Sequence, residues 1–162
     1  MQNAFIQTRD HKKRRSLMGP VWFIEGSAVA MAEINASRLW ASGKLSKWNN
    51  ASHPWRSLEQ RMTNKMKFVQ EKRKMCTTLL PDSYDSECRQ LAYDSGGWAI
   101  AYLMNKFGQD VLLKSFHPNV EKLGWEACFK KTFGQSSAEF VSEFEKFVDL
   151  PRSEQVKVLP AF

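Results

Sequence analysis

The sequence predicts an all-α protein, and three observations support this fold class. Apolar residues recur every three or four positions in several long stretches, which is the spacing of one helix face. No stretch combines strand-like alternation with a hairpin signal. Residues that stop helices, such as Gly108, Gly134 and Pro151, separate the periodic stretches. The chain should therefore fold as a set of packed helices joined by short turns.

Composition and length agree with one globular domain. The 162 residues are 43% hydrophobic and 25% charged. No apolar run reaches the roughly 20 residues that a membrane-spanning helix needs, so we expect no transmembrane segment. We expect residues 1–150 to form a single helical domain and residues 151–162 to form a C-terminal tail. The composition does not indicate a cellular compartment.

The first half of the chain predicts two long helices. Residues before Pro20 read as the end of a helix followed by a charged loop. The first long helix should run from Pro20 to about Trp40. Its sequence is apolar over residues 21–32 except for Glu25, so we expect burial on most sides. After a loop over residues 41–54, an amphipathic and basic helix should run from about Trp55 to Met75.

The second half predicts four more helices. The clearest spans Asp85 to Phe107, because helical spacing of apolar residues continues for five turns. A short helix over residues 110–116 and another over residues 125–133 should follow. The last helix begins at Ser136, which opens an S-x-x-E capping box. Pro151 should end it, and we expect the residues after it to be loosely held.

The charge of the chain is unevenly distributed. Residues 1–75 carry 15 Lys and Arg against 5 Asp and Glu, whereas residues 76–162 carry 9 against 12. A basic half can bind nucleic acid or an anionic surface, and it can equally be a solvated helix face with a basic loop. Only one aromatic residue, Phe68, lies between Arg56 and Lys74, which is poor spacing for stacking on bases.

The cysteines and histidines give weak signals. Cys76 and Cys88 bracket a polar loop and could form a disulfide, or they could be two ordinary thiols. Cys128 lies in an apolar helical pattern and should be in the core. The three histidines stand in three different predicted loops and share no metal-binding spacing: His11, His53 and His117. The chain contains no phosphate-binding glycine loop and no G-x-S-x-G motif.

Glu25 is the first unusual residue. It interrupts the apolar run W-F-I-E-G-S-A of residues 22–28, and a carboxylate is seldom buried without a partner. Three explanations fit this position. The positive end of the helix dipole could stabilise the charge, an arginine could pair with it, or the carboxylate could bind a metal ion.

The second unusual stretch is Y-D-S-G-G, residues 93–97, inside the best-predicted helix. Each glycine in a helix interior costs roughly 1 kcal/mol relative to alanine. Such a pair usually permits the close approach of another backbone or of a ligand. Tyr93 stands three residues before Gly96 and could reach the same space, or it could be an ordinary surface tyrosine.

In this order, the two stretches resemble the gluzincin metallopeptidases, the thermolysin-like and aminopeptidase-like clan also called peptidase MA. In that family a helix with a pattern like W-L-x-E-G-x-A supplies the third zinc ligand, and a later Y-x-x-G supplies a tyrosine that stabilises the tetrahedral intermediate. The later segments W-A-I-A-Y-L-M-N-K-F-G and W-E-A-C-F-K-K-T-F-G-Q-S-S-A-E-F are similar to the helical end of these domains. The resemblance covers roughly residues 18–150.

The resemblance implies a fold and a function. The fold would be the helical C-terminal subdomain of a gluzincin-type domain, and the parent enzyme would use zinc to hydrolyse peptide bonds in a peptide or protein substrate. Glu25 would be a zinc ligand, and Tyr93 would donate a hydrogen bond to the oxyanion.

One part of the family pattern is absent, because the chain contains no H-E-x-x-H. That motif supplies two histidine ligands and the general base, so we expect this chain alone to be inactive and not to bind zinc tightly. The chain would be a fragment that starts just after the motif. A degenerate relative that kept the scaffold is one alternative, with Glu25 paired to Arg14 or Arg15. A basic helical module that binds nucleic acid or anionic surfaces through residues 56–74 is another.

Overall fold

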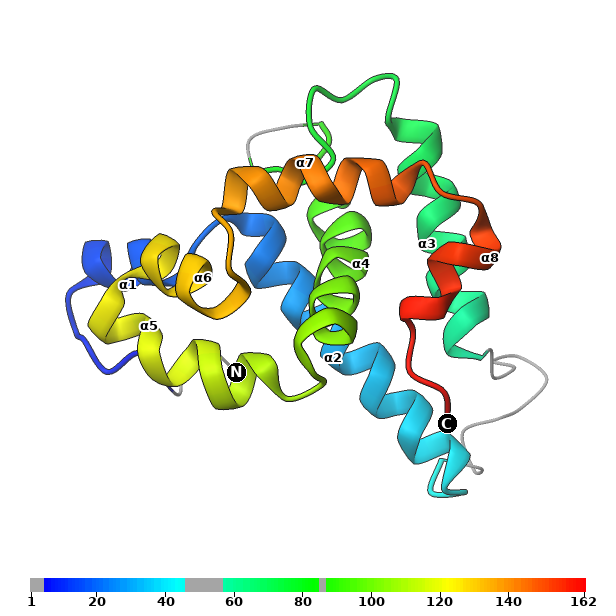
Figure 1. Ribbon diagram of the computed structural model, residues 1–162, viewed down its shortest axis with the longest axis horizontal. Helices are drawn as coiled ribbons and strands as arrows, with labels where there is room; N and C mark the ends of the chain where they lie inside the picture. The colour runs from blue at the N-terminus through cyan, green and yellow to red at the C-terminus, as the bar shows by residue number, and fades with distance from the viewer. Residues whose placement is uncertain (1–4, 46–56, 85–86) are drawn as a thin grey trace.

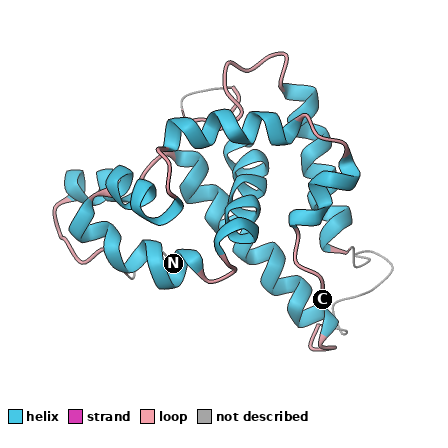
Figure 2. Cartoon of the chain, in the orientation of Figure 1, coloured by secondary structure: helices cyan, strands magenta, loops and turns pink. Residues whose placement is uncertain are grey.

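The computed structural model describes residues 5–45, 57–84 and 87–162. All regular secondary structure in these residues is helical, which confirms the predicted all-α fold class (Figure 2). The helices of the first half are α1 (His11–Met18), α2 (Val21–Ala41), α3 (Leu58–Lys72) and α4 (Gln90–Phe107). Those of the second half are η3 (Leu112–Phe116), α5 (His117–Leu123), α6 (Trp125–Phe133), α7 (Ser137–Val148), α8 (Arg152–Gln155) and η4 (Val156–Val158).

The two most apolar helices form the centre of the molecule. α4 crosses α2, and these two helices make the most extensive contact of any described pair (Figure 1). α3 and α8 lie on one side of this pair, whereas α1, α5 and α6 lie on the other. α7 packs over both central helices, because Phe140 stacks on Trp22 of α2 and also contacts Tyr102 of α4. The fold is thus a central helix pair enclosed by shorter helices.

Aromatic side chains fill the core on the α5–α7 side. Trp22 and Phe23 at the start of α2 are almost fully buried there, against rings from η3, α6 and α7. The other rings of this aromatic cluster are Phe116, Trp125, Phe129, Phe133, Phe140, Phe144 and Phe147. The free Cys128 is also buried, as predicted.

Capping residues define the starts of α3 and α7. Ser57 and Gln60 form a reciprocal capping box at the start of α3, and Ser136 and Glu139 form the predicted one at the start of α7. α2 and α6 also begin and end within one residue of their predicted limits. The α4 helix was expected to begin at Asp85, but it begins at Gln90, because residues 87–89 form a turn. Asp85 itself lies outside the described residues, as do Trp55, His53 and the predicted loop from residue 46 onward.

Two of the predicted loops are helices. The charged stretch before Pro20 forms α1, because the Asp10 side chain accepts a hydrogen bond from the Lys13 backbone and caps the helix. His117 was expected in a turn because it precedes a proline. Instead it begins α5, where Pro118 occupies the first turn and needs no hydrogen-bond donor.

The C-terminal residues are packed rather than loosely held. Residues 152–158 form α8 and η4, and Gln155 is buried with its amide donating to the backbone oxygen of Val148. η4 contacts α4, so the chain folds back onto the central pair after Pro151. Two turns of helix that follow a proline are too short for the periodicity that reveals longer helices.

No single helix in residues 5–45, 57–84 and 87–162 is both long and apolar enough to cross a bilayer. Only α1 and α2 taken together meet that test, and they are bent by 65° at their junction.

Candidate functional site

The helices that carry the two unusual stretches meet at their glycines. A Cβ atom added to Gly26 of α2 would lie 2.3 Å from the carbonyl carbon of Gly96 in α4. A Cβ added to Gly96 would lie 2.4 Å from the carbonyl oxygen of Trp22. Neither distance can accommodate a side chain, so the two backbones touch here. The prediction that Gly96 permits a close backbone approach is therefore confirmed.

This contact brings the two candidate site residues to the same crossing. Glu25 directly precedes Gly26, and Tyr93 lies one helical turn before Gly96. Both side chains are half-buried. Backbone contact leaves little freedom for the helices to slide, so both residues are carried on a rigid part of the fold.

The partner of Glu25 is a tyrosine rather than an arginine. The Tyr84 hydroxyl donates a hydrogen bond to Glu25 Oε1. Arg14 and Arg15, the partners expected for a degenerate relative, donate instead to the backbone oxygens of Ile6 and Gly19. Among the described residues no cation forms an ion pair with Glu25, and its second oxygen, Oε2, has no hydrogen-bond partner.

The contact with Glu25 also changes the acidity of Tyr84. The hydrogen bond to Glu25, together with partial burial and the negative charge of Glu25, raises the pKa of Tyr84 to about 12. The Arg15 guanidinium opposes this change in the Tyr84 pKa without cancelling it. We call Glu25, its hydrogen-bond partner Tyr84, and Tyr93 of the same helix crossing the Glu25 site.

A disulfide closes the loop that carries Tyr84. Cys76, just after α3, is bonded to Cys88, just before α4, with their Cα atoms 6.0 Å apart. The sequence left the disulfide and two free thiols open, and the structure contains the disulfide. It encloses a loop that starts beside the buried Leu79 and Leu80 and reaches Tyr84. We call residues 77–84 the Tyr84 loop.

The described residues do not form a zinc site by themselves. No group of three potential ligands among His, Cys, Asp and Glu occurs in the parts of the chain that the structure describes. Glu25 would be a single carboxylate ligand, whereas a catalytic zinc takes three protein ligands and a water. His11 is exposed on α1, and His117 is buried against the aromatic rings of Phe5 and Phe116. We therefore derive no reaction step through a metal ion.

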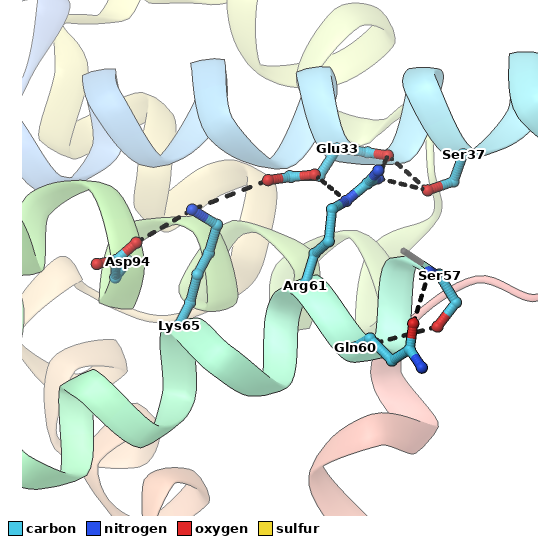
Figure 3. Close-up of polar contacts among 7 residues, drawn as sticks. All are labelled: Glu33, Ser37, Ser57, Gln60, Arg61, Lys65 and Asp94. Atoms are coloured by element: carbon cyan, nitrogen blue, oxygen red, sulfur yellow. Dashed lines mark hydrogen bonds and ion pairs between the residues drawn. The ribbon is translucent and has the colours of Figure 1, made fainter. Parts of the chain in front are cut away.

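A second polar cluster lies further along the same helices. Arg61 of α3 contacts Glu33 of α2 at 2.7 Å and donates a 2.8 Å hydrogen bond to Ser37 (Figure 3). Lys65 bridges Glu33 at 3.8 Å and Asp94 of α4 at 3.1 Å. The four charged residues, Glu33, Arg61, Lys65 and Asp94, line part of an open depression of about 500 Å³. Because the two cations and two carboxylates already pair with one another, the cluster ties three helices together and leaves no net charge for a ligand.

The pairing also reduces the free positive charge on α3. Of the cations predicted to make this helix basic, Arg61 and Lys65 belong to the cluster above. Arg73 pairs with Asp149, and Lys72 lies over the Phe68 ring at 5.8 Å from its centroid. A surface whose cations are engaged within the protein attracts nucleic acid less, so the structure gives no added support to that interpretation.

Comparisons of the chain with models of protein families, with curated proteins and with solved structures found no match. Tyr84 is the member of the Glu25 site that sequence reasoning missed. The one available signal was its position between Cys76 and Cys88, because a disulfide would fix that loop against the helices.

Proposed function

We propose that this chain is the helical C-terminal subdomain of a gluzincin-type zinc metallopeptidase, in which Glu25 is a zinc ligand and Tyr93 is the oxyanion donor. The observation that carries the proposal is the backbone contact between Gly26 and Gly96. It brings the E-G stretch of α2 and the Y-x-x-G stretch of α4, which the resemblance assigns to one active site, to the same crossing.

An uncovered face of α2 supports the proposal. Ala28, Ala32, Asn35 and Leu39 are exposed, although they lie on a helix whose opposite face is buried in the core. These positions follow the i, i+4, i+7, i+11 spacing of one helical stripe, and small residues on such a stripe allow another helix to pack closely. In the proposal an H-E-x-x-H helix packs on this face and supplies the ligands and the base that the chain lacks.

The roles of the chain's own residues follow from their chemistry. Glu25 presents Oε2, which has no partner among the described residues, while Oε1 accepts the Tyr84 hydrogen bond. Tyr93 offers a phenolic hydroxyl, a group that can donate to an oxyanion. Without the H-E-x-x-H helix we expect neither tight zinc binding nor peptide cleavage.

The deciding experiment begins with the coding sequence upstream of Met1. If it continues in frame and encodes H-E-x-x-H, the longer chain is produced and its zinc content and peptide hydrolysis are measured. Glu25→Gln should lose zinc. Tyr93→Phe should keep zinc and lose about 10²-fold in kcat, the typical effect of removing one oxyanion donor. Tyr102→Phe is the matched control, because that tyrosine bonds to Glu143, away from the Glu25 site.

Two outcomes would overturn the proposal. A stop codon or an unrelated sequence upstream would mean that the chain is a non-catalytic relative or a binding module. Stoichiometric, tight zinc binding by the 162-residue chain itself would mean that the ligands come from elsewhere in this sequence.

A further inference from the structure

We propose that Tyr84 is a positioning residue for Glu25 and that the Cys76–Cys88 disulfide keeps it there by closing the Tyr84 loop. What the positioned carboxylate then binds rests on the proposed function. The positioning itself depends only on contacts within this chain.

The first observation is the state of the Glu25 carboxylate. Tyr84 donates to Oε1, and Oε2 has no partner among the described residues. A side chain of three rotatable bonds is thereby held at one oxygen and left open at the other. This is the arrangement in which a supporting hydrogen bond orients a metal-binding carboxylate without competing for its second oxygen.

The second observation is how the Tyr84 loop is attached to α2. The backbone N–H groups of Val21 and Trp22 lie in the first turn of that helix, where they have no partner within the helix. They donate instead to the backbone oxygens of Asp82 and Pro81, at 3.3 and 3.1 Å. The loop thus caps the helix that carries Glu25, one turn before the carboxylate. Tyr84 follows Asp82 by two residues and reaches Glu25 from the capping segment.

The third observation is the exposure of Tyr84. Its side chain is 46% exposed, so packing alone does not hold the phenol in place. The loop before it is fixed by the buried Leu79 and Leu80, and after it the chain is tied by Cys88 to the end of α3. The disulfide is therefore the attachment on the C-terminal side of Tyr84.

The test follows the Tyr84 hydroxyl at pH 7 by NMR of tyrosine labelled with ¹³C at Cζ, whose chemical shift depends on the hydrogen bond that the hydroxyl makes. In the wild-type chain the Tyr84 signal should differ from that of a tyrosine in water, because its hydroxyl donates to Glu25. In the Cys76→Ser/Cys88→Ser variant the Tyr84 signal should move to the position of a tyrosine in water. The Tyr102 signal should not change, because that hydroxyl donates to Glu143 in another part of the fold.

Two other results of this experiment would overturn the proposal. An unchanged Tyr84 in the double variant would mean that the disulfide does not hold the loop. A parallel change in the Tyr102 signal would mean that the whole fold, rather than the loop, depends on the disulfide.

A second variant keeps the disulfide and removes only the hydrogen bond. Tyr84→Phe should speed carbodiimide-driven amide coupling at Glu25 by about fivefold. This is the change in rate that corresponds to the free energy of one ordinary hydrogen bond. The coupling rate at the exposed Glu71 should stay the same and serves as the reference. An equal rate at Glu25 in wild type and variant would exclude positioning by Tyr84. Neither readout involves zinc, so a failure of the proposed function would leave these results intact.

Discussion

The α2–α4 crossing and the aromatic cluster hold the same helix by opposite means. At the crossing, Gly26 and Gly96 remove side chains so that two backbones touch. About one turn earlier, Trp22 and Phe23 of the same helix enter a cluster of large rings from η3, α6 and α7. The first region leaves no space for an added atom, whereas the second is filled by the bulk of its side chains.

This difference separates the contacts that stabilise the fold from the contacts that position the Glu25 site. Each buried ring removes a large apolar area from water, so the cluster should contribute strongly to the free energy of unfolding. The glycine contact buries little area but fixes the spacing of the helices that carry Glu25 and Tyr93. Changes in the cluster should therefore unfold the chain, and changes at the crossing should also displace the Glu25 site.

The largest effect should come from deleting a central ring. Phe129→Ala should lower the free energy of unfolding by about 4 kcal/mol, because it leaves a cavity in a fully buried cluster. Urea denaturation measures this value, and Phe162→Ala, at a residue 50% exposed, is the control. Equal losses in the two variants would contradict the claim that the cluster contributes strongly to stability. Phe129 contacts the rings of Trp22, Phe23, Trp125, Phe133 and Phe140.

An added methyl group at the crossing should be nearly as damaging. Gly96→Ala should cost about 3 kcal/mol in urea denaturation, because the new Cβ meets the backbone oxygen of Trp22 at 2.4 Å. Gly97→Ala is the matched control on the same helix. There the new Cβ meets a side-chain methyl of Val29 at 2.9 Å, and the gain in helix propensity offsets part of the cost. A Gly97 variant as unstable as the Gly96 variant would mean that the backbone contact is not the special feature.

Acid should weaken the cluster through His117. Its ring is 1% exposed, neither nitrogen has a hydrogen-bond partner among the described residues, and burial lowers its pKa from 6.5 to about 4. Between these two values the unfolded chain binds a proton that the folded chain does not, so stability falls as the pH drops from 6.5 toward 4. The loss attributable to His117 should reach about 3 kcal/mol at pH 4.

The contribution of His117 is isolated by measuring the free energy of unfolding against pH for the wild type and two variants. His117→Phe should keep its stability at pH 7 and lose about 3 kcal/mol less than wild type on going to pH 4. His11→Phe, at an exposed position on α1, should follow the wild-type curve. Superimposable curves for wild type and His117→Phe would show that this histidine is not buried neutral.

The sequence was informative where periodicity or capping extended over several turns. α2 was predicted within one residue of its limits, and α7 begins one residue after its predicted start, although it ends at Val148 rather than at Pro151. The special packing at Gly96 followed from the cost of glycine in a helix. α1 and the helical His117 were missed because short helices depend on single capping bonds and tertiary contacts, which leave little periodicity. Tyr84 was missed for a different reason. It meets Glu25 across 59 residues of chain, and no local pattern encodes such a contact.

The smallest predicted effect concerns Lys65, and it tests whether the glycine contact alone holds α2 against α4. Lys65 joins Asp94 of α4 to Glu33 of α2, and the Asp94 side chain is only 10% exposed. Lys65→Met should therefore cost about 1–2 kcal/mol, since a nearly buried carboxylate loses its cation. Lys67→Met, on the exposed face of α3, is the matched control and should cost little.

Because salt screens a partly exposed ion pair, the difference between the two variants should shrink in 1 M salt, where the screening length is about 3 Å. A difference that does not respond to salt would assign the cost to packing of the lysine stem. No difference at all would mean that the glycine contact alone holds α2 against α4, with the ion pairs following from it.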